Sequence, residues 1–304
     1  MATLYTQQSS NIAKTWILMG LFLVIIVALG WFFSFYFQDP SILLFALIFS
    51  LLMNIFSYWY SDKITLSIAG AKPANRADYF DLYTTVENLS ITAGIPMPKV
   101  YIIPDPAPNA FATGRNKEHA TVAVTSGLLA MMNKTELEGV IAHELSHIGN
   151  RDILLSTVVV VLVGLVTLLS DFFIRISFFG GFGGRRGGDG EGNQATLILG
   201  IIGVILIVLS PIIATLIQLA ISRRRESLAD ESGALLTRYP EGLASALEKI
   251  EGYTRPMIHA NNATAHLYLS NPFGPNSKKT SFLARLFLTH PPIEERIAAL
   301  RGME

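Results

Sequence analysis

Four hydrophobic blocks dominate the polarity pattern of this chain. The first, Thr15 to Phe37, has 23 residues without a charge, and the second, Ser41 to Tyr60, is also free of charged residues. A helix needs about 20 apolar residues to cross the core of a bilayer, so each block is long enough to span it. Asp39 and Pro40 make a turn between them. The pattern predicts an N-terminal transmembrane hairpin in residues 1–61, retained as an anchor because no signal-peptide cleavage site follows the first block.

The third and fourth blocks are hydrophobic runs that lie beside polar motifs. Ile153 to Ser170 has 18 residues between two aspartates, and Ala195 to Ser222 is longer but contains a proline and a glutamine. Their length favours a second helix pair in residues 153–221, with a flexible glycine-rich loop at 180–193. Buried core helices of a large domain, or partial embedding in the bilayer, are the alternatives.

The soluble segments have the pattern of a mainly α domain with a small β-sheet. Strand-like runs occupy residues 99–103 and 119–125. Helical signals cover residues 75–93, 135–150, 222–236, 240–253 and 291–301. Thr135 and Glu138 are expected to form a capping box at the start of the helix at 135–150. These segments predict a single folded domain that is formed by two separate parts of the chain, residues 62–152 and 222–304.

Charge is low and balanced. Basic and acidic residues both number 23, and charged residues make up 15% of the chain, against about 25% in typical soluble domains. Zero net charge gives no support for a nucleic-acid partner. The chain has no cysteine, so any metal must be held by His, Asp or Glu. If all four blocks span, most basic residues near their ends share a side with both termini, and the positive-inside rule places that side in the cytoplasm.

The predicted helix at 135–150 carries the motif His143-Glu144-Leu145-Ser146-His147. Residues i and i+4 share a helix face, so both imidazoles can bind one zinc ion at about 2.0–2.1 Å. Zinc lowers the pKa of a bound water to about 7, and Glu144 can take its proton, so that the resulting hydroxide attacks a peptide carbonyl. A surface helix with two solvated histidines is the alternative.

A catalytic zinc site needs a third protein ligand and an open fourth position. Glu226 and Asp230 lie four residues apart in the helix predicted for 222–236, and therefore on one face. Glu226 is the candidate third ligand, and Asp230 can orient a zinc-bound imidazole from outside. The alternative is the end of a membrane helix whose Glu226 pairs with arginine. Ligands of this type suit zinc but also accept other divalent ions.

Four motifs in this order resemble the HtpX-type family of membrane metallopeptidases, which is related to the CAAX prenyl endopeptidases. They are Asn109 to Gly114, His143 to His147, Ser222 to Asp230, and Thr289 to Pro292, and the hairpin before them also matches. The resemblance implies a gluzincin-like domain with one zinc ion on His143, His147 and Glu226, and with Glu144 as catalytic acid and base. It also implies quality-control proteolysis of misfolded or membrane proteins at the bacterial cytoplasmic membrane. Ser227 departs mildly from the family pattern and is not expected to affect zinc.

Substrate contacts are predicted on two segments. Proteases commonly bind substrate as an added strand at a sheet edge, and the candidate edge is the strand with Ala120, Thr121, Val122, Ala123 and Val124. An internal strand is an equal alternative. Asn109 is a candidate for one wall of the cleft, or part of a plain turn. His290 is a candidate donor to the oxyanion, with capping of the helix at Pro291 as the alternative.

Two further hypotheses come from other classes of function. Cleavage within the membrane would need the histidine motif inside a spanning segment, but charged residues at both ends of its helix place it outside the bilayer core. A non-catalytic scaffold or sensor with a structural zinc site would need a fourth protein ligand, and it would leave Glu144 without a role. Polypeptide substrates and the lipid bilayer are the expected partners, and the sequence indicates no oligomeric state.

Overall fold

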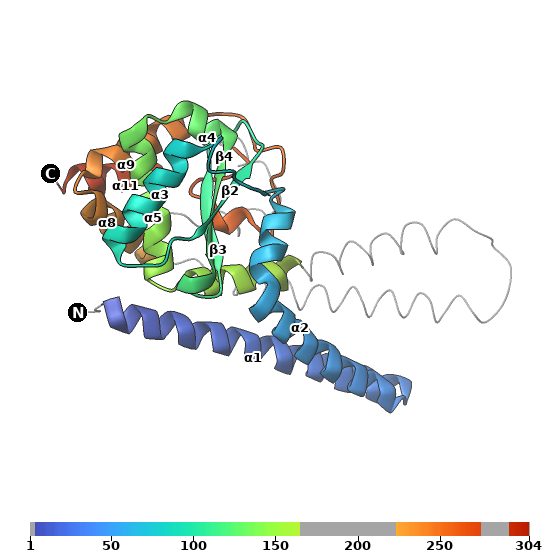
Figure 1. Cartoon of the computed structure of the whole chain (residues 1–304). Coiled ribbons are helices and arrows are strands. Elements are labelled where there is room, and N and C mark those ends of the chain that lie inside the picture. The colour runs from blue at the N-terminus through green and yellow to red at the C-terminus, as the bar shows by residue number, and fades with distance from the viewer. Residues whose placement is uncertain (1–3, 165–222, 275–291, 304) are drawn as a thin grey trace, which may run out of the picture.

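The computed structural model describes residues 4–164, 223–274 and 292–303. The fourth hydrophobic block, the loop 180–193, the second part of the third block and His290 lie outside these residues. Within them the protein is mainly helical with one small mixed sheet, as predicted. Figure 1 shows a hairpin of two long helices and, at its end, a domain of helices and strands.

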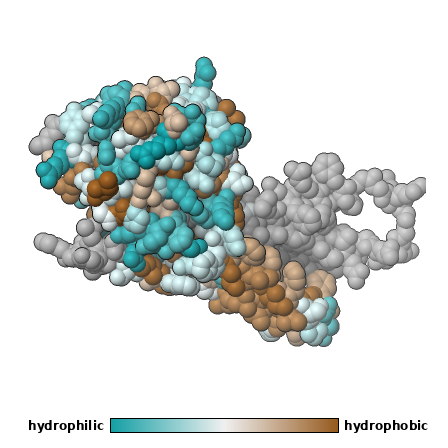
Figure 2. All heavy atoms as spheres, viewed as in Figure 1, coloured by the Kyte–Doolittle hydropathy of each residue, from teal (hydrophilic) through white to brown (hydrophobic). Residues whose placement is uncertain are grey.

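Two long helices, α1 (Leu4–Phe37) and α2 (Pro40–Ile68), form the predicted hairpin. Both are long and apolar enough to cross a membrane. They pack closely at Gly30, where a Cβ atom would lie 2.3 Å from that of Ala46. The surface of the hairpin facing the viewer in Figure 2 is largely hydrophobic, in contrast to the domain. α2 continues past Tyr60, the end of its charge-free run, and so carries the chain directly into the domain.

A mixed sheet holds β1 (Lys72–Pro73), β2 (Lys99–Ile103), β3 (Ala110–Gly114) and β4 (Ala120–Thr125) in the order β1-β2-β4-β3. β4 pairs in parallel with β2 and antiparallel with β3. The candidate edge strand at residues 120–125 is therefore not at an edge, and the equal alternative, an internal strand, is the one the structure shows. β4 is internal and all of its residues are buried, so its small side chains fit a strand enclosed on both sides. β3, the segment predicted as a cleft wall or turn, is an edge strand, and β1 is at the other edge.

Several helices pack on one side of the sheet (Figure 1). They are α3 (Phe80–Ala93), α5 (Lys134–Gly149), α8 (Arg223–Thr237), α9 (Pro240–Glu251) and α11 (Ile293–Arg301). α3 begins at Phe80 instead of the predicted Asn75, which caps a preceding turn. α5 contacts α3, α8, α9 and β3, and α4 (Ser126–Met131) leads into it from β4. α5 therefore lies at the centre of the domain's main hydrophobic core.

The start of α5 is fixed by a capping box two residues earlier than predicted. Asn133 is the N-cap, its side chain accepts from the Glu136 amide at 3.0 Å, and the Glu136 carboxylate accepts from the Asn133 amide at 2.8 Å. Thr135 and Glu138 are therefore not the capping pair. The Glu136 carboxylate also accepts from Lys249 Nζ at 2.7 Å, which ties α9 to the beginning of α5.

The first part of the third hydrophobic block forms a helix over Ile153–Gly164, bent by 86° from α5. The bend occurs at a turn in which Arg151 has a φ of 57°. Side chains of this helix pack against Leu18 and Phe22 of α1 in a second hydrophobic core. The described part of the block is thus mostly enclosed by protein, and the bend returns Asp152 toward the end of α5.

Candidate metal centre and active site

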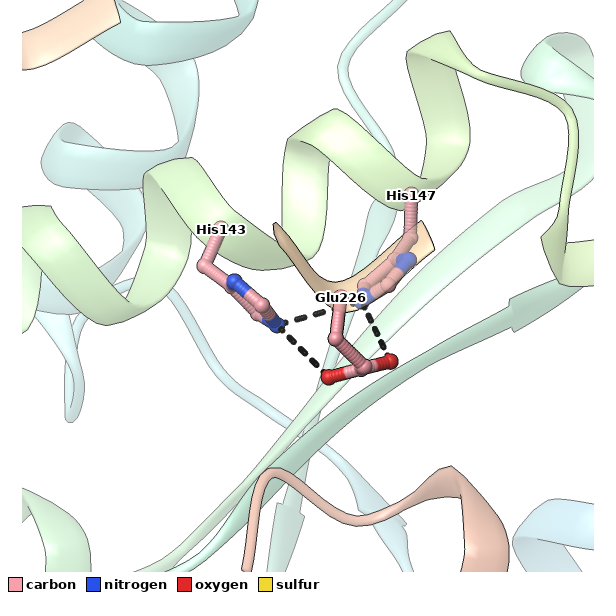
Figure 3. A group of neighbouring side chains, drawn as sticks. All are labelled: His143, His147 and Glu226. Carbon is pink, nitrogen blue, oxygen red and sulfur yellow. Dashed lines mark hydrogen bonds and ion pairs between the residues drawn. The ribbon is translucent and has the colours of Figure 1, made fainter. Parts of the chain in front are cut away.

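α5 presents the two histidines of the motif on one face, as helical spacing requires. The rings of His143 and His147 meet edge to face with centroids 4.7 Å apart, and their Nε2 atoms are 3.1 Å apart (Figure 3). His143 is buried and His147 is partly buried. Two imidazole nitrogens therefore converge on a single point at the surface of α5.

Glu226 reaches the same point from α8. Its carboxylate oxygens lie 3.8 Å from His143 Nε2 and 3.7 Å from His147 Nε2 (Figure 3). Candidate donor atoms of these three residues all lie within 4.8 Å of one another. The approach of α8 depends on Gly233, where a Cβ atom would lie 3.0 Å from the His143 backbone nitrogen. A larger residue at this position would push α8 away from α5.

Carboxylates lie against the outer nitrogens of both rings. Asp230, one turn after Glu226 on α8, has Oδ1 at 2.9 Å from His143 Nδ1. Asp152, just beyond the end of α5, has Oδ2 at 3.0 Å from His147 Nδ1. A carboxylate in this position holds the proton on Nδ1 and leaves the Nε2 lone pair for a metal. The sequence analysis proposed Asp230 for such a role but missed Asp152.

Arg296 of α11 completes the buried network. Its Nε donates to Asp230 Oδ2 at 2.8 Å and its Nη2 donates to Asp230 Oδ1 at 2.7 Å. Its Nη1 donates to the Leu269 carbonyl at 3.3 Å and lies 3.9 Å from a Glu226 oxygen. The side chain is only 2% exposed. The sequence analysis missed Arg296 as well, since a single charged position in an amphipathic helix does not indicate burial.

The donor set fits a divalent metal ion. Two ligands at about 2.0–2.1 Å from a tetrahedral zinc ion are roughly 3.3 Å apart, and the corresponding separations here are 3.1, 3.7 and 3.8 Å. Nε2 lone pairs that face each other at 3.1 Å repel unless a cation or proton lies between them. Among the described residues, three side chains form this group: His143, His147 and Glu226.

The surroundings shift the pKa values of the two imidazole rings in opposite directions. Burial lowers the pKa of His147, but the carboxylates of Asp152, Glu226 and Glu144 outweigh burial and raise it to about 10. For His143 burial dominates, so its pKa lies below the ordinary value despite the neighbouring Asp230. The negative potential around His147 favours a cation at the point where the rings meet.

Glu144 lies beside the ring pair and lines a small cavity of about 30 Å³, enough for a water molecule. Its side chain is buried, and burial raises the pKa of its carboxyl to about 7, against the opposing effect of nearby His147. The backbone amide of Ala112, in the middle of β3, donates to this carboxyl. A carboxyl with a pKa near 7 can both accept and return a proton at neutral pH.

The edge strand β3 borders this cavity through Ala112. The residues predicted to bind substrate on the neighbouring strand do not line it within the described part of the chain: Ala120, Thr121, Val122, Ala123 and Val124. β4 lies behind β3, so it supports the edge from the interior of the sheet.

The other predicted residues have different positions. Asn109 is buried, donates through Nδ2 to the Ser270 carbonyl at 2.9 Å and accepts at Oδ1 from the Ser270 amide at 3.2 Å. It therefore holds the segment near residue 270 in place and does not line the cavity. His266, in the short helix η2 (Ala265–Leu267), does line the cavity and was missed by the sequence analysis. Its Nε2 donates to the Ser156 carbonyl at 3.0 Å.

The chain is similar to known proteases over nearly its whole length. Residues 77–304 match Peptidase family M48. A protein described as "Protease HtpX homolog" from Caldanaerobacter subterraneus subsp. tengcongensis is 50% identical over 302 residues, covering 99% of this chain and 98% of the relative. A second protein of that description, from Thermoanaerobacter pseudethanolicus, is 51% identical over 303 residues, with coverage of 99% and 98%. The crystal structure of S. mikatae Ste24p matches with a TM-score of 0.48 and 17% identity, covering 97% of this chain and 67% of that one.

Proposed function

Because the chain belongs to Peptidase family M48 and is a membrane protease of the HtpX type, we propose that it is a zinc-dependent endopeptidase. The observation that carries this proposal is the convergence of the donor atoms of His143, His147 and Glu226 within 4.8 Å. A structural zinc ion is normally enclosed by four protein ligands, whereas this group has three among the described residues. The buried carboxyl of Glu144 beside it has no use in a structural site.

The proposed zinc ion and the residues around it have different roles in the reaction. A bound zinc ion supplies Lewis-acid chemistry, because it polarises a carbonyl and lowers the pKa of a water. His143 and His147 offer Nε2 to the ion because Asp230 and Asp152 hold the protons on Nδ1. Arg296 in turn fixes the orientation of Asp230 with its two hydrogen bonds.

Glu144 is proposed to carry the proton. Its carboxylate takes a proton from the attacking water and returns it to the nitrogen of the leaving amine. Both transfers run near pH 7 only if the carboxyl has a pKa close to that value, and burial raises the pKa of Glu144 to about 7. The carboxylate works in a cavity of about 30 Å³, which also limits competing water.

The substrate is proposed to bind along the outer edge of β3. The Asn109 carbonyl accepts from the Thr125 amide at 2.9 Å, so the backbone N–H and C=O groups of alternate residues pair with β4. The backbone groups of Ala110 and Ala112, which lie between those residues, point away from β4. The Ala110 carbonyl is already bonded to the Leu269 amide at 3.0 Å. The Ala112 amide donates to Glu144, so a peptide added as a further strand would pair with the Ala112 carbonyl, next to Glu144.

We also propose that the protein acts at the bacterial cytoplasmic membrane with its site facing the cytoplasm, on misfolded or membrane proteins. Two helices can span a bilayer, and the distribution of basic residues favours a cytoplasmic domain. The domain lies at the end of the hairpin, so substrates that reach the site pass close to the membrane surface (Figure 1).

A digestion assay with matched variants tests the proposed chemistry. Full-length protein in detergent is compared with Glu144→Gln and with the control Glu138→Gln, which alters another glutamate of α5 outside the cavity. We expect Glu144→Gln to keep its zinc and lose casein cleavage, and Glu138→Gln to keep both. Chelation should abolish cleavage and added zinc should restore it. Wild-type rates in Glu144→Gln, or in the chelated protein, would contradict the proposal.

A further inference from the structure

A basic pocket lies where α2 enters the domain, apart from the metal centre. Its volume is about 360 Å³. Its walls come from α2 and from the end of the sheet nearest to α2, and they include Trp59, Tyr60, Asp62, Lys63, Lys99 and Arg115. Three of these side chains are cations and one is a carboxylate. Within the described residues, the ion pairs lie elsewhere and none of them joins these three cations to a carboxylate.

The depth of this pocket relative to the membrane follows from the hairpin. The charge-free run of α2 ends at Tyr60 and that of α1 begins at Thr15. Trp16 of α1 stacks on Tyr58 of α2 with ring centroids 6.0 Å apart, so the two runs end at the same level. Trp16 and Trp59 are exposed, as aromatic residues at a membrane interface commonly are. The pocket therefore lies at the depth of the lipid headgroups.

Arg115 is held in position at the wall of this pocket. Its guanidinium lies 4.4 Å from the centroid of the Trp59 ring, and its Nη2 is 2.8 Å from His119 Nε2. His119 Nδ1 is 2.7 Å from Asn116 Oδ1, which accepts only, so Nδ1 carries the proton and Nε2 accepts from Arg115. Because Arg115 is ordered before any anion binds, binding costs less conformational entropy.

We propose that this pocket binds the phosphate of an anionic phospholipid headgroup. Lys63, Lys99 and Arg115 offer charge-assisted hydrogen bonds to phosphate oxygens, and the Trp59 ring forms an apolar wall beside them. Basic residues at a membrane surface each strengthen the binding of anionic lipid about fivefold. Arg115 directly follows Gly114, the last residue of β3, so a bound lipid would anchor the edge strand at the membrane surface.

Tryptophan fluorescence can test this site in the full-length protein. The chain has three tryptophans, and Trp16→Phe with Trp31→Phe leaves Trp59 as the single reporter in the pocket wall. The protein is placed in mixed vesicles of phosphatidylcholine and phosphatidylglycerol. In one series the phosphatidylglycerol carries brominated chains, and in the other the phosphatidylcholine carries them. The two quenching curves give the preference for anionic lipid beside Trp59. We expect a preference of about fivefold or more for phosphatidylglycerol.

Two double variants separate the pocket from general charge effects. Lys63→Gln with Lys99→Gln should lower the preference about fivefold or more. Arg76→Gln with Lys134→Gln removes the same charge at exposed positions outside the pocket and should leave it unchanged. The proposal is overturned if wild type shows no preference, or if both double variants lose it equally. It is also overturned if inorganic phosphate, added to the mixed vesicles at constant ionic strength, removes the preference, which would assign the pocket to free phosphate.

Discussion

Replacement of Arg296 by glutamine tests whether a residue that is not itself a proposed ligand sets the affinity for zinc. Arg296 makes two hydrogen bonds to Asp230, at 2.7 and 2.8 Å, and Asp230 lies 2.9 Å from Nδ1 of the proposed ligand His143. The variant leaves the buried carboxylate of Asp230 without its guanidinium partner. The His143 ring should then lose its fixed orientation.

The magnitude follows from burial. The side chains of Arg296 and Asp230 are 2% and 6% exposed, and breaking a buried ion pair by removing one partner costs about 3–5 kcal/mol. Loss of an outer carboxylate partner typically lowers metal affinity 10–100-fold. One effect acts in the opposite direction, because Arg296 Nη1 lies 3.9 Å from Glu226 and repels a metal ion there. We expect the loss of orientation to exceed this relief of repulsion, since the guanidinium contacts Asp230 directly.

Arg301→Gln is the matched control. Arg301 belongs to the same helix and pairs with Glu241 and Glu248, but on the surface, where ion pairs contribute little. Zinc affinity is measured by chelator competition, and thermal unfolding in detergent is followed in parallel. Arg296→Gln should unfold earlier and bind zinc 10–100-fold more weakly than Arg301→Gln. Equal or tighter zinc binding would refute the reasoning, as would an equally large effect of Arg296→Gln in an Asp230→Asn background.

Three further variants probe the packing, the outer contacts and the pH dependence of the domain. Gly233→Ala should weaken zinc binding, because its Cβ would lie 3.0 Å from the His143 nitrogen; metal analysis that shows full zinc content would disprove this. Asp152→Asn should lower zinc affinity about 10–100-fold by releasing Nδ1 of His147, which chelator competition can measure. Glu136→Gln should cost about 1–2 kcal/mol of stability at neutral pH. Burial raises the pKa of Glu136, but its hydrogen bonds to Lys249, Asn133 and Ser245 outweigh burial and hold the pKa below its ordinary value. The contribution of its carboxylate is therefore complete above the ordinary pKa of a glutamate and is lost as the pH falls through the lowered pKa of the folded protein. Unfolding curves of wild type and Glu136→Gln should consequently converge in acid, and a constant difference would contradict the assignment.

Local periodicity was sufficient for the features that lie within one element. The charge-free runs predicted both helices of the hairpin, and their lengths match helices that can span a membrane. The spacing of His143 and His147 predicted that both rings share a face, and their Nε2 atoms are 3.1 Å apart. These features depend on the geometry of a single helix, which the sequence specifies directly.

Features that depend on the packing of one element against another could not be predicted from local sequence patterns. Strand order cannot be read from alternation within one strand, so β4 was taken as an edge although it lies between β2 and β3. Asp152 contacts His147 only because the chain bends by 86° after α5. Arg296 contacts Asp230 only because α11 packs against α8. The capping box was also assigned to the wrong residues. Asn133 precedes Thr135, and its side chain already accepts from the Glu136 amide in the first turn of α5.

The proposed metal ligands come from two helices that are far apart in the chain, and this separation sets the order in which they are synthesised. Glu226 follows His147 by 79 residues, and the third and fourth hydrophobic blocks lie between them. A ribosome that has released only α5 has produced two imidazoles without their acidic counterpart. On the proposed ligand set, the growing polypeptide cannot complete the metal centre until those hydrophobic blocks have left the ribosome.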